Sequence, residues 1–267
     1  MIAPYDRNGK SYDSTRRADP HLTDRLLAHL RPMPSKQHID VACGTGNYTV
    51  ALAATGVEMI GTDVSAKMIA AARAKSAAVA RDRQSPRWLV ADVAALPFGT
   101  NTFAGATCTL AIHHFADLGA AFTEVGRVVC AGGRFVILTA RPDQMNRYWL
   151  FRYFPEMMAR AAAQMPNLGA TAAALSAAGF VRVATEPYTV RPDVQDLFLY
   201  SGKHRPMLYL DPIVRANISS FANLAREGEI AEGCERLVHD IETGYVDRVI
   251  AEAEHEGGDY LFVIAER

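Results

Sequence analysis

Short apolar runs of strand length alternate with helical patterns along the first half of the chain. The strand-like runs occupy residues 38–42, 58–62, 87–91, 103–110 and 133–140. The helical patterns occupy residues 22–30, 49–54, 66–81 and 118–129. Strands that alternate with helices predict parallel βαβ units, which assemble into a doubly wound sheet.

The alternation breaks after residue 141. Residues 142–166 are rich in aromatic side chains and methionine, and residues 188–256 are irregular, with helical patterns at 211–226 and 230–242. A helix at 171–179 and a strand at 180–187 separate these two segments, and a last strand at 259–265 closes the chain. We therefore expect an α/β fold: a Rossmann-like, seven-stranded, mostly parallel sheet with helices on both faces and an inserted helical lid.

The same pattern divides the chain into six parts. They are an N-terminal arm with a first helix (1–36), a ligand-binding core (37–142), a first lid insert (143–168), a core helix and strand (169–187), a second lid insert (188–256) and a final core strand (257–267).

Composition narrows the class of partner. The formal net charge of −1 provides no global field to hold a nucleic acid or an anionic membrane. No apolar run approaches the roughly 20 residues that span a bilayer, and the N-terminal residues are polar. The 4 cysteines stand singly, which favours reduced thiols over a zinc site or disulfides. We expect a cytoplasmic monomer or homodimer that acts on a small molecule, without nucleic acid or membrane partners.

A glycine turn follows the first strand of the core, in the sequence HIDVACGTGNYT that begins at His38. Glycines at this place let a ligand approach the backbone closely, at the strand end where open α/β sheets bind nucleotides. Thr49 stands where a dinucleotide-binding fingerprint has its third glycine, which argues against a nicotinamide cofactor. By itself, a Gly-x-Gly sequence is also compatible with a purely structural turn.

The segment from Asp40 to Gly46 resembles the first motif of class I S-adenosylmethionine-dependent methyltransferases. The resemblance covers residues 37–142, the helix and strand at 170–187 and the last strand, and it leaves out the inserts. It implies S-adenosylmethionine as the cofactor and no metal. The residues that it places around the cofactor in the core are Asp40, Ala42, Gly44, Gly46, Asp63, Val64, Met68, Asp92, Val93, Thr109 and Leu110.

Within this resemblance, individual residues take individual tasks. Asp63 would accept hydrogen bonds from both ribose hydroxyls, Met68 would line the adenine slot, and Asp92 with the backbone N–H of Val93 would meet the adenine ring. Spacing alone also allows Met68 to be a core residue and Asp92 to be a helix cap. In similar proteins a tyrosine and an arginine of the N-terminal arm cover the methionine end of the cofactor, which points to Tyr12 and Arg16.

The fourth strand ends in the sequence CTLAIHHFAD, from Cys108 to Asp117. It resembles the small-molecule branch of ubiquinone/menaquinone-biosynthesis-type methyltransferases, and it lacks the Asn/Asp-Pro-Pro-aromatic turn of the branch that modifies amides and bases. His113 and His114 are candidate general bases because imidazole titrates near neutral pH, and packing is the alternative role. We take His114 as the catalytic candidate.

The inserts offer candidates for the acceptor site, since loops on a rigid scaffold carry variable function. We expect Tyr148 and Tyr200 to take part in catalysis, and Asn146, Tyr153 and Arg205 to bind the substrate, with simple core packing as the alternative for each aromatic. Lys203, His204 and Arg205 form a basic cluster that could face a carboxylate or phosphate.

The sequence thus predicts an enzyme that transfers a methyl group from S-adenosylmethionine to an O, N or C nucleophile of a small molecule. Two alternatives use the same pocket. One is a cyclase or lyase that consumes S-adenosylmethionine, and the other is a non-catalytic module that only binds it.

Overall fold

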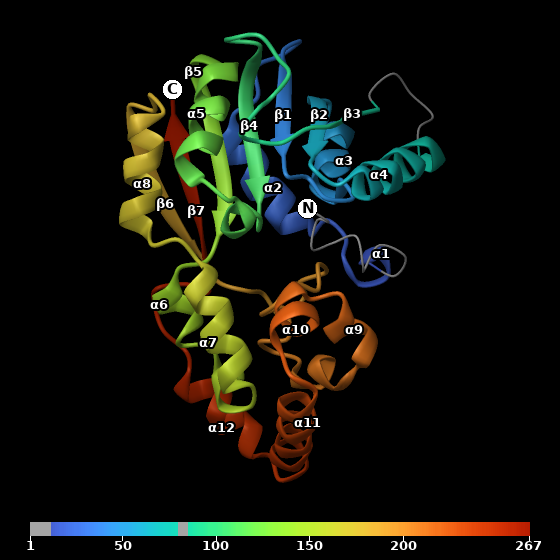
Figure 1. Cartoon of the computed structure of the whole chain (residues 1–267). Coiled ribbons are helices and arrows are strands. Elements are labelled where there is room, and N and C mark those ends of the chain that lie inside the picture. The colour runs from blue at the N-terminus through green and yellow to red at the C-terminus, as the bar shows by residue number, and fades with distance from the viewer. Residues whose placement is uncertain (1–11, 80–84) are drawn as a thin grey trace.

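A seven-stranded sheet forms the body of the protein in the computed structural model, which describes residues 12–79 and 85–267, with backbone only for residues 12, 78 and 79. The strand order is β3-β2-β1-β4-β5-β7-β6 (Figure 1). β7 pairs antiparallel with β5 and β6, and the other neighbours are parallel. The expected Rossmann-like, mostly parallel sheet is confirmed. The strands are β1 (Gln37–Val41), β2 (Glu58–Asp63), β3 (Arg87–Val90), β4 (Phe103–Thr109), β5 (Val129–Thr139), β6 (Arg182–Tyr188) and β7 (Tyr260–Glu266).

Helices cover both faces of the sheet, and several begin at a residue whose side chain caps the first turn. α2 follows Asp19, whose side chain accepts a hydrogen bond from the backbone of the first turn, and α5 follows Asp117 in the same way. Leucines of α2 and α3 pack in one apolar cluster, and α5 and α8 pack in a second. The helices of this layer are α2 (Pro20–Leu30), α3 (Asn47–Ala54), α4 (Ala66–Val79), α5 (Leu118–Val128) and α8 (Leu168–Ala177).

Two inserted segments gather beyond the end of β5, at the bottom of Figure 1. The first follows β5 directly, and the second connects β6 to β7. We call their helices together the lid. They are α6 (Pro142–Met145), η3 (Trp149–Arg152), α7 (Pro155–Gln164), η4 (Pro206–Leu210), α9 (Pro212–Ala216), α10 (Ser219–Leu224), α11 (Glu227–Glu242) and α12 (Tyr245–Glu252).

The two inserts pack on each other as one unit. Phe154 meets Phe221 edge to face, with ring centroids 4.9 Å apart, and a Cβ atom at Gly233 would overlap the ring of Phe154. The backbone of α11 at Gly233 therefore lies directly against Phe154 of the first insert, with no room for a side chain between them. Before α2, a short helix α1 (Tyr12–Thr15) lies beside the lid end of the sheet (Figure 1).

Candidate functional site

A cavity of about 610 Å³ lies where the carboxyl ends of the parallel strands meet the lid. Its wall combines the glycine turn after β1, the ends of β2 and β4, the loop after β3, the arm before α2 and parts of both inserts. This is the place where open α/β sheets bind ligands, and the volume is in the usual range of small-molecule sites.

The glycine turn supplies the part of the wall in which backbone is exposed to a ligand. Gly44 has φ +56° and Gly46 has φ +74°, both in the left-handed region that favours glycine. A Cβ atom at Gly46 would overlap the indole of Trp88, whereas one at Gly44 would meet no atom within 4 Å. Gly46 therefore serves the packing of the turn on β3, and Gly44 keeps the cavity open.

Asp63 ends β2 and fastens the glycine turn to it. Its Oδ2 accepts a hydrogen bond from the backbone N–H of Gly44 at 2.9 Å, and its Oδ1 accepts one from Ser65 at 2.8 Å. The carboxylate remains part of the cavity wall, next to the exposed side chain of Val64. Asp63 thus places a negative charge beside the turn, where hydroxyl donors of a ligand would find a charged acceptor.

Three further expected residues line the same side of the cavity: Met68, Asp92 and Val93. Met68 is 2% exposed, so it is both wall and core. Asp92 is exposed and accepts a hydrogen bond from the backbone of Ala94 at 2.9 Å. Asp92 therefore both caps the turn that follows it and lines the cavity.

Asp40 lies deeper, beneath the turn, and the adjoining Ala42 is also part of the wall. Thr49 Oγ1 donates to one Asp40 carboxylate oxygen at 2.5 Å, and Thr107 Oγ1 donates to the other at 2.8 Å. Burial raises the pKa of Asp40 to about 6, although both threonine hydrogen bonds lower it. The carboxyl group joins β1, α3 and β4 under the floor of the cavity.

The end of β4 contributes polar residues to the cavity wall. Thr109 Oγ1 and His113 Nδ1 are buried and have no hydrogen-bond partner among the described residues. Leu110, with φ +53°, and His114 continue this wall. Thr109 and His113 thus line the cavity as residues, while these two atoms lie beneath its surface.

The two histidines are held neutral. Burial lowers the pKa of His114 to about 4, and burial with the neighbouring His114 lowers the pKa of His113 to about 3. His113 is half-buried and His114 is exposed, and both line the cavity. A neutral imidazole at physiological pH can accept a proton or a hydrogen bond.

These lowered pKa values predict a pH-dependent stability. Below its ordinary value of 6.5, a histidine of the unfolded chain takes up a proton that His114 in the folded chain takes up only near pH 4. The neutral His114 therefore costs no free energy of unfolding above pH 6.5. As the pH falls from 6.5 toward 4, the folded chain loses stability, because only the unfolded chain takes up this proton. We expect His114→Gln to gain about 1 kcal/mol of stability relative to the parent between pH 7.5 and 4.5, after allowance for solvent screening. Denaturant unfolding of the parent and the variant at pH 7.5 and 4.5 measures this gain. If the difference in unfolding free energy between the two proteins is the same at both pH values, His114 is not held neutral in the folded chain.

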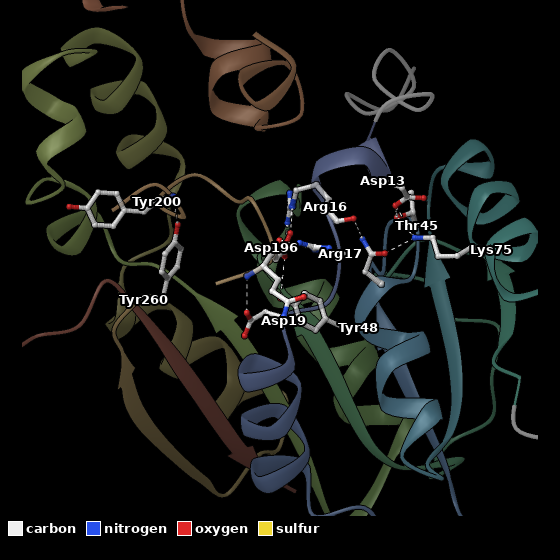
Figure 2. A network of polar contacts seen from close by, with 12 residues as sticks. Asp13, Arg16, Arg17, Asp19, Thr45, Tyr48, Lys75, Asp196, Tyr200 and Tyr260 are labelled. Carbon is white, nitrogen blue, oxygen red and sulfur yellow. Dashed lines mark hydrogen bonds and ion pairs between the residues drawn. The ribbon is translucent and has the colours of Figure 1, made fainter. Parts of the chain in front are cut away.

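The arm before α2 also reaches the cavity. Arg16 lines it, and its guanidinium is paired with Asp196 of the second insert (Figure 2). Beside it, Lys75 Nζ of α4 lies 2.8 Å from Asp13 Oδ1 and 3.1 Å from Thr45 Oγ1, which ties α1 to the glycine turn. The side chain of Tyr12 and the residues of the arm before it lie outside the described part of the chain.

Tyr148 and Tyr200, the expected catalytic tyrosines, are not among the residues that line the cavity. Their rings stack on each other with centroids 3.8 Å apart, and both are at most 2% exposed. The Tyr148 hydroxyl donates to the backbone carbonyl of Asp259, and the Tyr200 hydroxyl accepts from the backbone N–H of Trp149 at 3.2 Å. Both hydroxyls are thus bonded to backbone atoms of the protein.

The expected substrate-binding residues of the inserts are likewise placed away from the cavity wall. Tyr153 is buried and donates to Asp240 Oδ2 at 2.8 Å. Arg205 Nη2 donates to the carbonyl of Val194 at 2.7 Å, and Asn146 is exposed. Packing and backbone capping are the roles that the structure gives to Tyr153 and Arg205.

We expect Tyr200→Phe to affect stability and leave the cavity unchanged. The substitution leaves the backbone N–H of Trp149 without its acceptor, at a cost of about 1–2 kcal/mol. The free energy of unfolding measures this loss, and ligand binding by the folded variant serves as the control. A change in affinity with unchanged stability would contradict the structural role.

The structure adds wall residues that no sequence pattern selects. On the lid side they are apolar or uncharged polar residues, and no motif marks them, because only the folded inserts bring them together. They are Met145, Ala161, Gln164, Met165, Phe198, Leu199, Ile218, Ser219 and Ser220, and Tyr48 and Tyr260 join them from α3 and β7.

Two global features accompany the site. Among the residues that the structure describes, no helix has the length and hydropathy needed to cross a membrane. The cysteines Cys43, Cys108, Cys130 and Cys234 are free thiols.

Comparison with known proteins relates the core of this chain to methyltransferases. Residues 39–137 match the methyltransferase domain family. The demethylmenaquinone methyltransferase of Corynebacterium kroppenstedtii is 32% identical over 138 residues, which are 50% of this chain and 56% of that protein. The ubiquinone/menaquinone biosynthesis C-methyltransferase of Cereibacter sphaeroides is 33% identical over 135 residues, 49% of this chain and 53% of that protein. This chain therefore matches these curated relatives over about half of their length.

A solved structure extends the likeness to the lid. A protein of Anabaena variabilis, described as a methyltransferase from an antibiotic biosynthesis pathway, is 29% identical with a TM-score of 0.83, over 95% of this chain and 99% of that chain. The match to the domain family contains the glycine turn and the strand ends that line the cavity, and the Anabaena structure shares the remaining architecture.

Proposed function

We propose that the chain binds S-adenosylmethionine and transfers the methyl group to an O, N or C nucleophile of a small molecule, because residues 39–137 match the methyltransferase domain family. The observation that carries this proposal is the cavity, in which the glycine turn and the acids at strand ends stand on one side and the lid on the other. We place the reaction in the cytoplasm, which suits four free thiols.

The residues present fit this cofactor. The open space at Gly44 admits a ligand to the backbone, and Asp63 offers a charged acceptor for ribose hydroxyls. Asp92 and Met68 stand where an adenine ring would lie in this family, and Thr109 also lines the cavity. A sulfonium is cationic, and the carboxylates of the wall favour a cation.

When bound, the cofactor supplies a methyl group on an already activated sulfur, so the chain needs mainly to align the acceptor and exclude water. The lid covers the strand ends and closes that side of the cavity. His114 lines the cavity and is neutral at physiological pH, and it would accept the acceptor's proton.

The lid side of the cavity indicates the character of the acceptor. Its surface is largely apolar, as at Phe198, Leu199 and Ile218. Its polar groups at Gln164 and at the two adjacent serines after Ile218 are uncharged, and the carboxylate of Asp196 is already paired with Arg16. We therefore propose an acceptor with an apolar body and neutral hydrogen-bonding groups, in place of the anionic substrate that the basic cluster at 203–205 suggested.

Product analysis tests the proposal. The protein is incubated with S-adenosylmethionine in a metabolite extract and the products are analysed by mass spectrometry. A metabolite heavier by one methylene, together with S-adenosylhomocysteine, supports methyl transfer. Methylthioadenosine without a methylated product indicates a lyase or cyclase, and binding without consumption indicates a module that only holds the cofactor. Either of these outcomes overturns the proposal.

A further inference from the structure

Two segments that are far apart in the sequence meet along one edge of the cavity. The backbone N–H of Leu197 donates to the carbonyl of Thr15 at 3.1 Å, and that of Gln195 donates to Asp19 Oδ2 at 2.9 Å. The same edge carries Arg17, whose Nε lies 3.4 Å from the Gln195 carbonyl (Figure 2). The arm before α2 and the second insert are therefore joined at this edge by one backbone–backbone hydrogen bond and two hydrogen bonds between backbone and side chain.

At the centre of this edge lies an ion pair on the cavity wall. Arg16 Nε donates to Asp196 Oδ1 at 2.5 Å, and Arg16 Nη2 donates to Asp196 Oδ2 at 3.2 Å. The side chains are 14% and 2% exposed, respectively. Tyr48 Oη donates to Asp196 Oδ2 at 3.1 Å, and burial raises the pKa of Tyr48 well above its ordinary value. The carboxylate is thus fixed by a cation from the arm and by a hydroxyl from α3.

The buried carboxylate decides where the guanidinium lies. Arginine is a long and flexible side chain that would otherwise turn its charge to water, because a buried charge without a partner is costly. Asp196 compensates that charge, and its two-point contact also sets the plane of the guanidinium. Loss of the Asp196 charge therefore weakens the preference of Arg16 for this position.

We propose that Asp196 is a positioning residue for cofactor binding: it holds Arg16 at the cavity wall, where the guanidinium binds the carboxylate of the amino-acid part of S-adenosylmethionine. This inference rests on the proposed function. It adds that the second insert, which the family domain does not contain, takes part in recognising the cofactor as well as the acceptor.

The test compares two ligands by calorimetry on the full chain. S-adenosylhomocysteine contains the amino-acid carboxylate, and methylthioadenosine lacks it. We expect Asp196→Asn to weaken S-adenosylhomocysteine binding by about 10- to 30-fold and to leave methylthioadenosine binding within about twofold. Tyr48→Phe is expected to cause a smaller change in the same direction, because it removes one of the contacts that fix Asp196.

A matched control and a double variant isolate the cause. Asp193→Asn removes the same charge from the same insert, in an exposed pair with Arg191, and it should leave both affinities unchanged. If Asp196 acts through Arg16, adding Asp196→Asn to Arg16→Gln should weaken S-adenosylhomocysteine binding no further than Arg16→Gln alone.

The outcomes separate this inference from the proposed function. If Asp196→Asn weakens the binding of both ligands equally, or if the losses in the double variant are additive, Asp196 is not a positioning residue for Arg16. In that case, binding of S-adenosylhomocysteine by the parent protein still supports the cofactor site. A parent protein that binds neither ligand overturns the proposed function and this inference together.

Discussion

Replacing Asp63 by alanine is expected to weaken binding of S-adenosylmethionine by about two orders of magnitude or more. The carboxylate would accept hydrogen bonds from two ribose hydroxyls, and each charge-assisted hydrogen bond is worth about 1.5–3 kcal/mol. The same carboxylate holds the backbone N–H of Gly44 at 2.9 Å, so the variant also loosens the turn that faces the ligand. Calorimetric titration with S-adenosylmethionine measures the effect.

Two further variants support the interpretation of that measurement. Asp63→Asn keeps an acceptor oxygen but loses the charge, and it should give an intermediate affinity. Asp143→Ala removes an exposed carboxylate that pairs with Arg141 outside the cavity, and it should bind like the parent. A folded Asp63→Ala protein with parental affinity would show that the cofactor lies elsewhere.

We expect Gly44→Val to abolish cofactor binding while the protein remains folded. Gly44 has φ +56°, and a side chain there would enter the cavity without meeting protein atoms within 4 Å. The left-handed backbone costs a non-glycine residue about 1–2 kcal/mol, which a folded domain of this size tolerates. The valine methyl groups would occupy the space that the cofactor needs. Thermal unfolding together with calorimetry separates the loss of binding from the loss of stability.

Two other glycines provide controls for this variant. Gly132 lies in β5 outside the cavity wall, with φ +78°, and a Cβ atom there would meet no atom within 4 Å. Gly132→Val therefore carries the backbone strain alone and should bind like the parent. Gly46→Val would push against Trp88 and should lose stability as well as binding. If Gly44→Val binds like the parent, the turn is only structural.

The core was predictable from the sequence because its elements are local. Parallel strands buried on both faces appear as continuous apolar runs, and the turn that requires Gly44 and Gly46 is marked by the glycines themselves. The boundaries were less certain. β5 begins at Val129, before the glycines of its first half, and the expected strand began at residue 133. Its pairing with β4 shifts register between Phe103 and Gly105, which no local pattern reveals.

The lid side of the site was not predictable, for a physical reason. Aromatic residues pack in a core and line a binding site with the same chemistry, so the sequence does not distinguish Tyr148 and Tyr200, which stack in the lid, from Tyr260, which lines the cavity. The partners of Asp196 are equally hidden, because Arg16 is separated from it by 180 residues and Tyr48 by 148. Such contacts exist only after the inserts have folded onto the core.

The packing of Trp88 against the glycine turn has a spectroscopic consequence. The chain contains 2 tryptophans. The Trp88 indole lies against Gly46 and Gly61, beside the turn that faces the cavity, whereas Trp149 is buried in the lid, between Tyr153 and Tyr209. Fluorescence from Trp88 reports on the cofactor side of the molecule, and fluorescence from Trp149 reports on the lid. The protein thus carries one intrinsic probe in each of the two parts that enclose its cavity.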